Sequence, residues 1–235
     1  MCDGETQVDF RAFLDDIRQS RDYAGQIVHI REEPARAPRF GELAAPLSDA
    51  ARNMLKGRGI GQLYVHQAQA VDLARAGRNM VVVTGTASGK TLCYTLPLVE
   101  RLLAEPDARA LLLFPTKALC QDQFRRFAKA LKDAGLDNVA AGVYDGDTPG
   151  ALRRKLRDAG RALFSNPDMV HATLMPEHAR WAEFLSRLRL VVLDELHVYS
   201  GIFGSNMVNL MRRLRRLCAH YGSDPQFICC SATIG

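Results

Sequence analysis

The sequence predicts an α/β domain in which a mostly parallel sheet is covered by helices on both faces. Two observations predict it. Short, almost entirely apolar runs recur along the chain, and segments of helical length and period separate them. Strands that are apolar at consecutive positions are typical of parallel sheets, which are buried on both faces. A ligand of such a sheet is expected at the carboxyl ends of its strands.

Each element follows from this pattern. The predicted strands are residues 79–84, 110–114, 138–144, 162–165, 188–194 and 227–232. The predicted helices between them are residues 88–104, 117–134, 149–159, 167–186 and 203–221. Towards the N-terminus, an amphipathic pattern predicts a helix over 6–22, and a second helix begins at the cap Ser48 and runs to about Lys56. We therefore predict a helical N-terminal extension over 1–60 and the sheet domain over 61–235.

Composition limits the class of protein. The chain has 235 residues, of which 47% are apolar and 24% charged, which excludes disordered tails, collagens and coiled coils. No apolar run approaches the roughly 20 residues of a membrane-spanning helix, and the first residues do not form a secretory signal. We therefore expect a cytoplasmic protein with no membrane contact. The six cysteines show no zinc-site spacing and favour reduced thiols over disulfides.

Charge is unevenly distributed. Residues 1–50 carry 6 basic and 10 acidic side chains, a net charge of −4, whereas residues 51–235 carry 25 basic and 16 acidic, a net charge of +9. A basic body favours a polyanionic partner such as nucleic acid. The basic runs at 153–157 and 212–216 are equally typical of solvated helix faces, so both interpretations stay open.

A glycine-rich turn follows the first predicted strand. It comprises Thr84, Gly85, Thr86, Ala87, Ser88, Gly89, Lys90 and Thr91. The backbone N–H groups of such a turn converge on phosphates, and the following helix presents its N-terminus to the same anion. Lys90 is suited to reach the β- and γ-phosphates, and the Thr91 hydroxyl to bind Mg²⁺. The turn therefore predicts a site for ATP and Mg²⁺, with Thr84 in place of the usual first glycine.

Two acids follow the fifth predicted strand. Asp194 ends this apolar strand and Glu195 comes next. In a nucleotide hydrolase, a carboxylate at this place holds Mg²⁺, and a neighbouring one orients or deprotonates the attacking water. The alternative is an ordinary acidic helix cap, which the phosphate turn makes less favoured.

Two weaker signals accompany these. Ser231 and Thr233 end the last strand, where their hydroxyls are candidates for hydrogen bonds to Asp194 or His197. Gln67 precedes the phosphate turn, and its amide matches the N6 and N7 edge of adenine, although an ordinary glutamine on a helix surface is an equal alternative.

In chain order these segments resemble the motifs of the superfamily 2 DEAD/DEAH-box helicases. Gln67 matches the Q motif, residues 84–91 motif I, 114–123 motif Ia, 165–171 motif Ib, 194–197 motif II and 231–233 motif III. The strings LYVHQ, YDGDTP and DELHVYSGIFGSN are most similar to the YprA/MrfA branch, the bacterial mitomycin-repair-type helicases. The resemblance implies a RecA-like P-loop fold, ATP-driven 3′→5′ movement on DNA and a role in DNA repair.

The resemblance also implies roles for single residues. Lys90 and Glu195 match catalytic positions, and His197, Ser231 and Thr233 match residues that couple the nucleotide to the strand. The positions that match contacts to the sugars and phosphates of single-stranded DNA, or of RNA, are Thr116, Lys117, Gly146, Asn166 and Pro167. DEAD-box proteins have an aromatic residue 17 positions before this glutamine, where the present sequence has Ala50. Tyr64 is the remaining candidate for stacking on adenine.

Members of the family have two RecA-like lobes with ATP between them, and this sequence ends just after motif III. We therefore expect lobe 1 of a longer protein, with a second lobe supplied in cis or in trans and little turnover by the single lobe. Two alternatives stay open: the motor lobe of another superfamily 2 translocase, and a non-catalytic nucleotide-binding module. A small-molecule P-loop kinase fits the turn but not motifs II and III.

Overall fold

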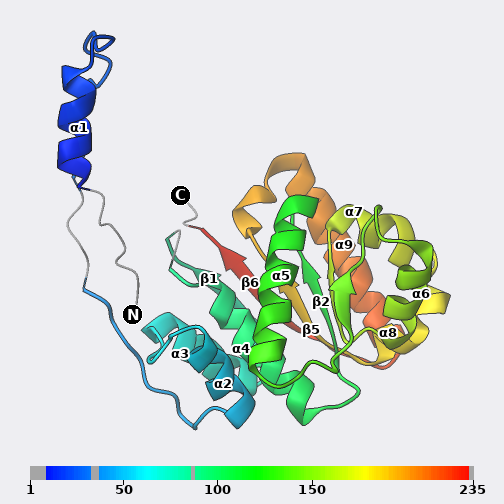
Figure 1. Ribbon diagram of the computed structural model, residues 1–235. Coiled ribbons are helices and arrows are strands. Elements are labelled where there is room, and N and C mark those ends of the chain that lie inside the picture. The colour runs from blue at the N-terminus through cyan, green and yellow to red at the C-terminus, as the bar shows by residue number, and fades with distance from the viewer. Residues whose placement is uncertain (1–8, 33–36, 86–87, 233–235) are drawn as a thin grey trace. The chain divides into compact units, whose positions relative to one another are not determined.

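The computed structural model describes residues 9–32, 37–85 and 88–232 (Figure 1). The chain forms two compact units, Met1–Pro38 and Arg39–Gly235, and each is described by itself. This division comes earlier than the boundary predicted between residues 60 and 61. The reason is that α2 (Asp49–Gly57), which the sequence grouped with the extension, packs against α4 (Thr91–Ala104) and α5 (Lys117–Asp133) of the second unit.

The described part of the first unit contains the helix α1 (Phe10–Gln19). It ends before residue 22, where the predicted helix ends, and residues 6–8 of that prediction lie outside the described residues. Asp9 caps it, because its Oδ1 accepts hydrogen bonds from the backbone N–H of Arg11 (3.0 Å) and Ala12 (3.3 Å). No residue of α1 is buried. The apolar residues that predicted this helix therefore lie on its surface.

Six parallel strands form the sheet of the second unit, in the order β1-β6-β5-β2-β4-β3. Their bounds are β1 Met80–Val83, β2 Arg109–Leu113, β3 Ala141–Val143, β4 Ala162–Ser165, β5 Leu188–Leu193 and β6 Gln226–Ser231. These bounds confirm the six predicted strands and their parallel arrangement. Every residue of β2, in the middle of the sheet, is buried, which agrees with the apolar run that begins at residue 110.

Helices cover both faces of this sheet (Figure 1). The helices α2 to α5 share a core with Leu112 and Val192, and the segments from α6 to α9 share a second core with Leu111 and Val191. Neighbouring strand residues enter different cores because side chains alternate across a sheet. The other α-helices of this unit are α3 Val65–Arg75, α6 Gly150–Ala159, α7 Pro167–Met169, α8 Ala182–Ser186 and α9 Gly201–His220.

The helix predicted over 167–186 is broken into pieces. After α7 the chain forms a π-helical turn at Val170–Leu174 and a 3₁₀ turn at His178–Trp181 before α8 begins. Pro176 lies between the two turns and lacks the backbone N–H that a continuous helix requires. Apolar periodicity correctly predicted that this segment covers the sheet, but not that it bends.

Arg109 places a charge inside the otherwise apolar strand β2. Its guanidinium donates to the carbonyl oxygens of Arg157 (3.0 Å) and Asp158 (2.8 Å) and to Glu183 (3.1 Å), and it lies 5.7 Å from the ring centre of Phe184. Burial lowers the pKa of Arg109, and the charge of Glu183 opposes that shift. This buried cation is stabilised by its partners and joins the end of α6 and the start of α8 to the sheet.

Within the described ranges, no helix is both long and apolar enough to cross a bilayer. In the same part of the chain, no three or more His, Cys, Asp and Glu side chains are grouped to hold a metal ion. The described cysteines, at positions 93, 120, 218, 229 and 230, are free thiols, as the sequence predicts.

The end of α6 yields a prediction about packing. A Cβ added at Gly160 would lie 2.3 Å from the carbonyl oxygen of Leu156 and 2.8 Å from Cδ2 of Leu163. The helix backbone must shift to accept it, so Gly160→Ala should lower the free energy of unfolding by about 1–3 kcal/mol in denaturant titrations. Gly150, the first residue of α6, has no atom within 4 Å of an added Cβ. Gly150→Ala is the matched control with unchanged or slightly higher stability, and equal losses in both variants would contradict the argument.

Candidate functional site

The glycine-rich turn joins β1 to α4. Lys90 stands at the start of α4, and its Nζ donates to the carbonyl oxygens of Thr84 (3.0 Å) and Gly85 (2.7 Å). The Thr84 and Ser88 hydroxyls are hydrogen-bonded to each other. The lysine ammonium is therefore held across the turn by acceptors that an anion can replace. Thr86 and Ala87, which the sequence also assigns to this turn, lie outside the described residues.

Helix α3 fixes the turn from one side. The Gln67 Nε2 donates to the carbonyl oxygen of Gly89 (3.1 Å), and the His66 Nε2 lies 3.0 Å from that of Ser88, so the imidazole tautomer with hydrogen on Nε2 donates there. Gly89 has a φ of 77°, which favours glycine, and a Cβ at this position would lie 2.5 Å from the Gln67 Nε2. The backbone conformation therefore favours glycine at position 89, and a larger residue would also displace the Gln67 amide from its bond to the turn.

Gln67 is 2% exposed, so the alternative of an ordinary surface glutamine is wrong. Its Oε1 accepts the backbone N–H of Tyr64 (2.9 Å), which leaves one amide hydrogen and one lone pair beyond these two bonds. Contact with adenine stays a prediction. The Tyr64 ring is nearly parallel to those of Phe40 (centroids 5.5 Å apart) and His66 (5.8 Å), so aromatic surface lies beside the turn.

Asp194 follows β5 and is only 5% exposed. Its Oδ1 accepts the backbone N–H of Glu195 (2.9 Å), and its Oδ2 accepts the hydroxyl of Tyr94 (3.1 Å). Burial raises the pKa of Asp194, while these two hydrogen bonds and the charge of Lys90 oppose the rise. The carboxylate is thus held in one orientation at a cost in desolvation.

Tyr94 is the contact at this site that the sequence analysis missed. It lies on α4 with 2% exposure, and its hydroxyl is also 3.2 Å from the Oε1 of Gln123 on α5. Burial and the charge of Asp194 raise the pKa of Tyr94 well above its ordinary value, so the phenol stays protonated and can donate. A tyrosine in an otherwise apolar helix face was the available signal, because a buried hydroxyl requires a partner.

A hydrogen bond between a side chain of motif II and the backbone of motif III joins these two motifs. The His197 Nδ1 accepts the backbone N–H of Ala232 (3.3 Å) and lies 3.4 Å from the Oε2 of Glu195. Because one nitrogen cannot accept and donate at the same time, the His197 Nδ1 binds the Ala232 N–H when it carries no hydrogen and the Glu195 carboxylate when it does. The expected hydroxyl contact is not seen, since the buried Ser231 Oγ has no hydrogen-bond partner among the described residues. Thr233 lies outside them.

Glu195 has a left-handed backbone with a φ of 53°. A residue with a Cβ pays roughly 1–2 kcal/mol for this conformation. Strain of this kind is concentrated at functional sites, where the surrounding structure compensates for it. Here the bond from the Glu195 N–H to Asp194 holds the strained backbone in place.

The residues expected to contact a strand follow β2, β3 and β4. Thr116 and Asn166 cap α5 and α7, accepting the backbone N–H of Leu119 (3.2 Å) and Met169 (2.8 Å) respectively. Pro167 opens α7, as proline commonly does.

Lys117 is exposed and pairs with Asp147 at 2.8 Å. The hydrogen bond to Asp147 raises the pKa of Lys117. Gly146 lies beside this pair, because a Cβ there would be 3.5 Å from the Lys117 Nζ. The lysine charge is thus partly compensated by a neighbour on the loop after β3.

The basic run at 153–157 divides into two kinds of residue. Arg153 donates to the carbonyl oxygens of Thr148 (2.8 Å) and Gly146, and so braces the loop after β3. Arg157 pairs with Asp158 at 2.8 Å. Arg154 and Lys155 are exposed on α6 and are the residues of this run that are open to a ligand.

The order of strands in the sheet separates the residues of the nucleotide site from those expected to contact a nucleic-acid strand. The turn, Asp194 and Ser231 lie at the carboxyl ends of β1, β5 and β6, which are neighbours, and the expected strand contacts follow β2, β4 and β3, which are also neighbours (Figure 1). Motifs that alternate along the chain are therefore sorted into two adjacent halves of one edge.

Comparison with known proteins identifies this arrangement. The family model described as DEAD/DEAH box helicase matches residues 64–235. The chain belongs to the DEAD/DEAH box helicase family. Among solved structures, this helicase domain is similar to the DUF1998 helicase MrfA bound to DNA, with 44% identity, a TM-score of 0.81 and coverage of 85% of this chain and 28% of that one. The helicase Lhr of Mycobacterium smegmatis has a TM-score of 0.69 at 27% identity, over 80% of this chain and 25% of that one.

Sequence relatives agree with this family assignment. The helicase domain is 43% identical to the ATP-dependent helicase YprA of Bacillus subtilis, over 88% of this chain and 28% of YprA. It is 41% identical to the ATP-dependent helicase HRQ1 of Saccharomyces cerevisiae, over 94% of this chain and 20% of HRQ1. The predicted RecA-like fold and YprA/MrfA resemblance are confirmed, and the chain spans less than a third of the length of these relatives.

The buried carboxylate gives a prediction about stability. Because burial raises the pKa of Asp194, the charged carboxylate costs stability above that pKa, and the cost disappears below the ordinary pKa of an unfolded aspartate. Asp194→Asn removes the charge. Its amide oxygen can still accept the Glu195 N–H, and its amide N–H can donate to the Tyr94 oxygen, whose hydroxyl then donates to Gln123. We expect this substitution to raise the free energy of unfolding by about 1 kcal/mol at pH 7, with the gain vanishing near pH 3.

Thermal unfolding between pH 3 and pH 8 measures this effect. Asp137, which is exposed, supplies the control variant Asp137→Asn, expected to be neutral throughout. A loss of stability in Asp194→Asn at pH 7 would show that the charge itself stabilises the fold.

Proposed function

We propose that this domain is the ATP-binding lobe of a nucleic-acid-dependent ATPase that works as a DNA helicase in its complete form. The observation that supports this most is the shared edge of the sheet, where the phosphate turn and Asp194 lie beside the expected strand contacts. Parallel strands form a rigid platform, so a change at the nucleotide is transmitted to the strand over a short distance. The names of YprA and HRQ1 as ATP-dependent helicases agree with this function.

The residues present fit ATP with Mg²⁺. A Cβ at Gly85 would meet no described atom within 4 Å, so the turn is open to a ligand there. Lys90 donates to two backbone carbonyls, of Thr84 and Gly85, that phosphate can replace. The Thr91 hydroxyl and the Asp194 carboxylate are the hard oxygen ligands that Mg²⁺ prefers. We assign the binding of the ATP phosphates to the turn from Thr84 to Thr91. When bound, Mg²⁺ neutralises phosphate charge.

The residues of the chain have distinct tasks in hydrolysis. Lys90 exchanges its two carbonyl acceptors for β- and γ-phosphate oxygens and compensates the charge that develops on them. Glu195 orients the attacking water and accepts its proton. His197 joins Glu195 to Ala232 at the end of β6. We propose that this contact, together with the hydroxyls of Ser231 and Thr233, couples the nucleotide state to the strand.

The adenine is proposed to lie beside α3. Gln67 retains one N–H and one lone pair for the base edge while it holds Gly89. Tyr64 is 39% exposed and Phe40 48% exposed, and their stacked rings offer an apolar face to a purine. This replaces the upstream aromatic residue that position 50 lacks.

A single strand is proposed to cross the other half of the edge. Thr116, Lys117, Gly146, Asn166 and Pro167 contact its sugars and phosphates, with Lys117 exchanging Asp147 for a phosphate. DNA is favoured because the MrfA structure contains DNA and the relative Hel308 of Thermococcus kodakarensis is named a DNA helicase. RNA is the alternative, since DExH13 of Arabidopsis thaliana is named an RNA helicase. Movement from 3′ to 5′ and a role in repair follow the YprA/MrfA resemblance.

A second RecA-like lobe, in cis or in trans, is proposed to complete the site. YprA extends far beyond the 28% of its length that this chain spans. In related nucleotide hydrolases, an arginine from a second lobe accelerates hydrolysis roughly 10³- to 10⁵-fold. Lys90 and Glu195 are both present, which favours a working half of an active site over a non-catalytic module.

Nucleotide binding and turnover test the proposal separately. We expect the chain to bind a fluorescent ATP analogue with Mg²⁺, Lys90→Ala to weaken this binding at least tenfold, and Glu195→Gln to leave it intact. ATP hydrolysis should be slow without a second lobe and lost in Glu195→Gln. Single-stranded DNA should increase turnover when the second lobe is supplied. Binding that is independent of Lys90 would exclude the phosphate site.

Salt dependence tests the contribution of α6. Arg154 and Lys155 are exposed and Arg153 is not, because it braces the loop. If both exposed cations neutralise phosphates, Arg154→Gln with Lys155→Gln should reduce the slope of log affinity against log salt by about 1.4 for single-stranded DNA. Fluorescence anisotropy between 50 and 200 mM salt, roughly the range where such slopes are measured, gives the slope. An unchanged slope would assign this run to a solvated helix face.

A further inference from the structure

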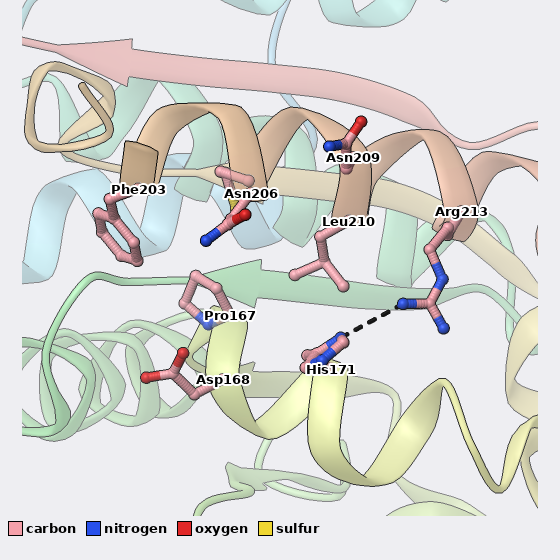
Figure 2. Close-up of a pocket in the computed structure, with 9 residues that line it drawn as sticks. Pro167, Asp168, His171, Phe203, Asn206, Asn209, Leu210 and Arg213 are labelled. Carbon is pink, nitrogen blue, oxygen red and sulfur yellow. Dashed lines mark hydrogen bonds between the residues drawn. The ribbon is translucent and has the colours of Figure 1, made fainter. Parts of the chain in front are cut away.

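An open cavity of about 370 Å³ lies between α7 and α9, apart from the residues assigned to ATP (Figure 2). Pro167 and His171 line it from the side of α7. Phe203, Asn206 and Arg213 line it from α9. One wall of the cavity thus comes from a segment that is expected to contact the strand. The other comes from α9, a helix to which the sequence assigned no function.

One end of the cavity is lined by apolar rings, an amide and the Asp168 carboxylate, and the other end is basic (Figure 2). The Phe203 ring, 39% exposed, and the Pro167 ring border the same space at one end, and buried Leu210 lies between them and the other end (Figure 2). The Asn206 amide points into the cavity between them (Figure 2). Such a site suits a flat molecule with apolar faces and hydrogen-bonding edges.

The other end of the cavity carries positive charge. The Arg213 guanidinium reaches across from α9 and lies 3.3 Å from the His171 Nδ1 (Figure 2). Arg213 belongs to the run at 212–216 for which a solvated helix face was the alternative. Here it closes one end of a cavity and keeps further N–H donors for a ligand. A ligand with an anionic group beside a flat ring matches both ends.

The place of the cavity narrows the choice of ligand. Asn166 and Pro167 directly follow β4, and both are proposed to contact the sugars and phosphates of the strand. A strand held there presents its bases within reach of the adjoining cavity. Single strands are bound elsewhere by stacking their bases on aromatic side chains, and amide side chains hydrogen-bond to base edges.

We propose that the cavity between α7 and α9 binds one unstacked nucleobase of the single strand. Phe203 and Pro167 contact the faces of the base, Asn206 its edge, and Arg213 the neighbouring phosphate. The proposal rests on the proposed function, because it assumes that the strand passes Asn166. It adds a contact to the base itself where the sequence predicted only contacts to the backbone.

Two oligonucleotides separate base binding from backbone binding. Fluorescence anisotropy at low salt is measured with a labelled twelve-nucleotide thymidine strand and with an abasic strand of equal length. We expect Phe203→Ala and Asn206→Ala each to weaken binding of the thymidine strand about five- to tenfold and to leave the abasic strand within twofold. Ile202, the exposed neighbour of Phe203 outside the cavity, supplies the control Ile202→Ala, for which neither affinity changes. Thermal unfolding confirms that the variants are folded.

Each result decides between the proposals. Losses confined to the thymidine strand support the base site. Equal losses for both strands, or none for either, overturn the base site and leave strand binding in place. If the unaltered chain binds neither strand, the proposed strand function fails and the base site fails with it.

Discussion

Parallel strand pairing is the constraint on which the site depends. When all strands run the same way, every strand ends at one edge, so each loop that follows a strand meets the others there. The six strands of this domain place the phosphate turn, Asp194 and the loops after β2, β3 and β4 at that edge. Right-handed crossovers require a helix between parallel strands, and these helices cover both faces. The apolar strands, the two cores and the position of the site thus follow from one pairing rule.

Several features of the site lower the stability of the fold. Asp194 is a buried carboxylate, Glu195 adopts a left-handed backbone and the Ser231 hydroxyl has no partner among the described residues. Each of these features is destabilising by itself. Neighbouring groups offset part of the cost, chiefly the hydrogen bonds that Asp194 accepts from the Tyr94 hydroxyl and the Glu195 N–H. A domain stabilised by two large cores tolerates such a cluster, and its polar groups are held ready for a ligand.

Much of the fold and site could be predicted from local sequence. Strands in the middle of a parallel sheet are largely apolar because both of their faces are buried. Short apolar runs marked all six strands, including β1, which exposes Val81 and Val83. Periodicity did not mark the break at Pro176. It predicted the helix α2 correctly but could not show that α2 packs against α4 and α5 of the second unit. The phosphate turn and the two acids were predictable because their chemistry depends on residues adjacent in sequence. Tyr94 and His66 were missed because each binds a group far away along the chain, and no local pattern marks such a partner.

The sequence by itself determined the class of fold, the residues of the phosphate turn and the acids at the end of β5, since each is encoded in a short segment. Only the tertiary structure decided which of these segments are neighbours. Strand order places β6 between β1 and β5 and so joins His197 to Ala232. It also sets α7 against α9, where Arg213 closes a cavity instead of a plain surface. The physical reason is that contacts between distant segments depend on the order of strands in the sheet, which a one-dimensional pattern does not contain.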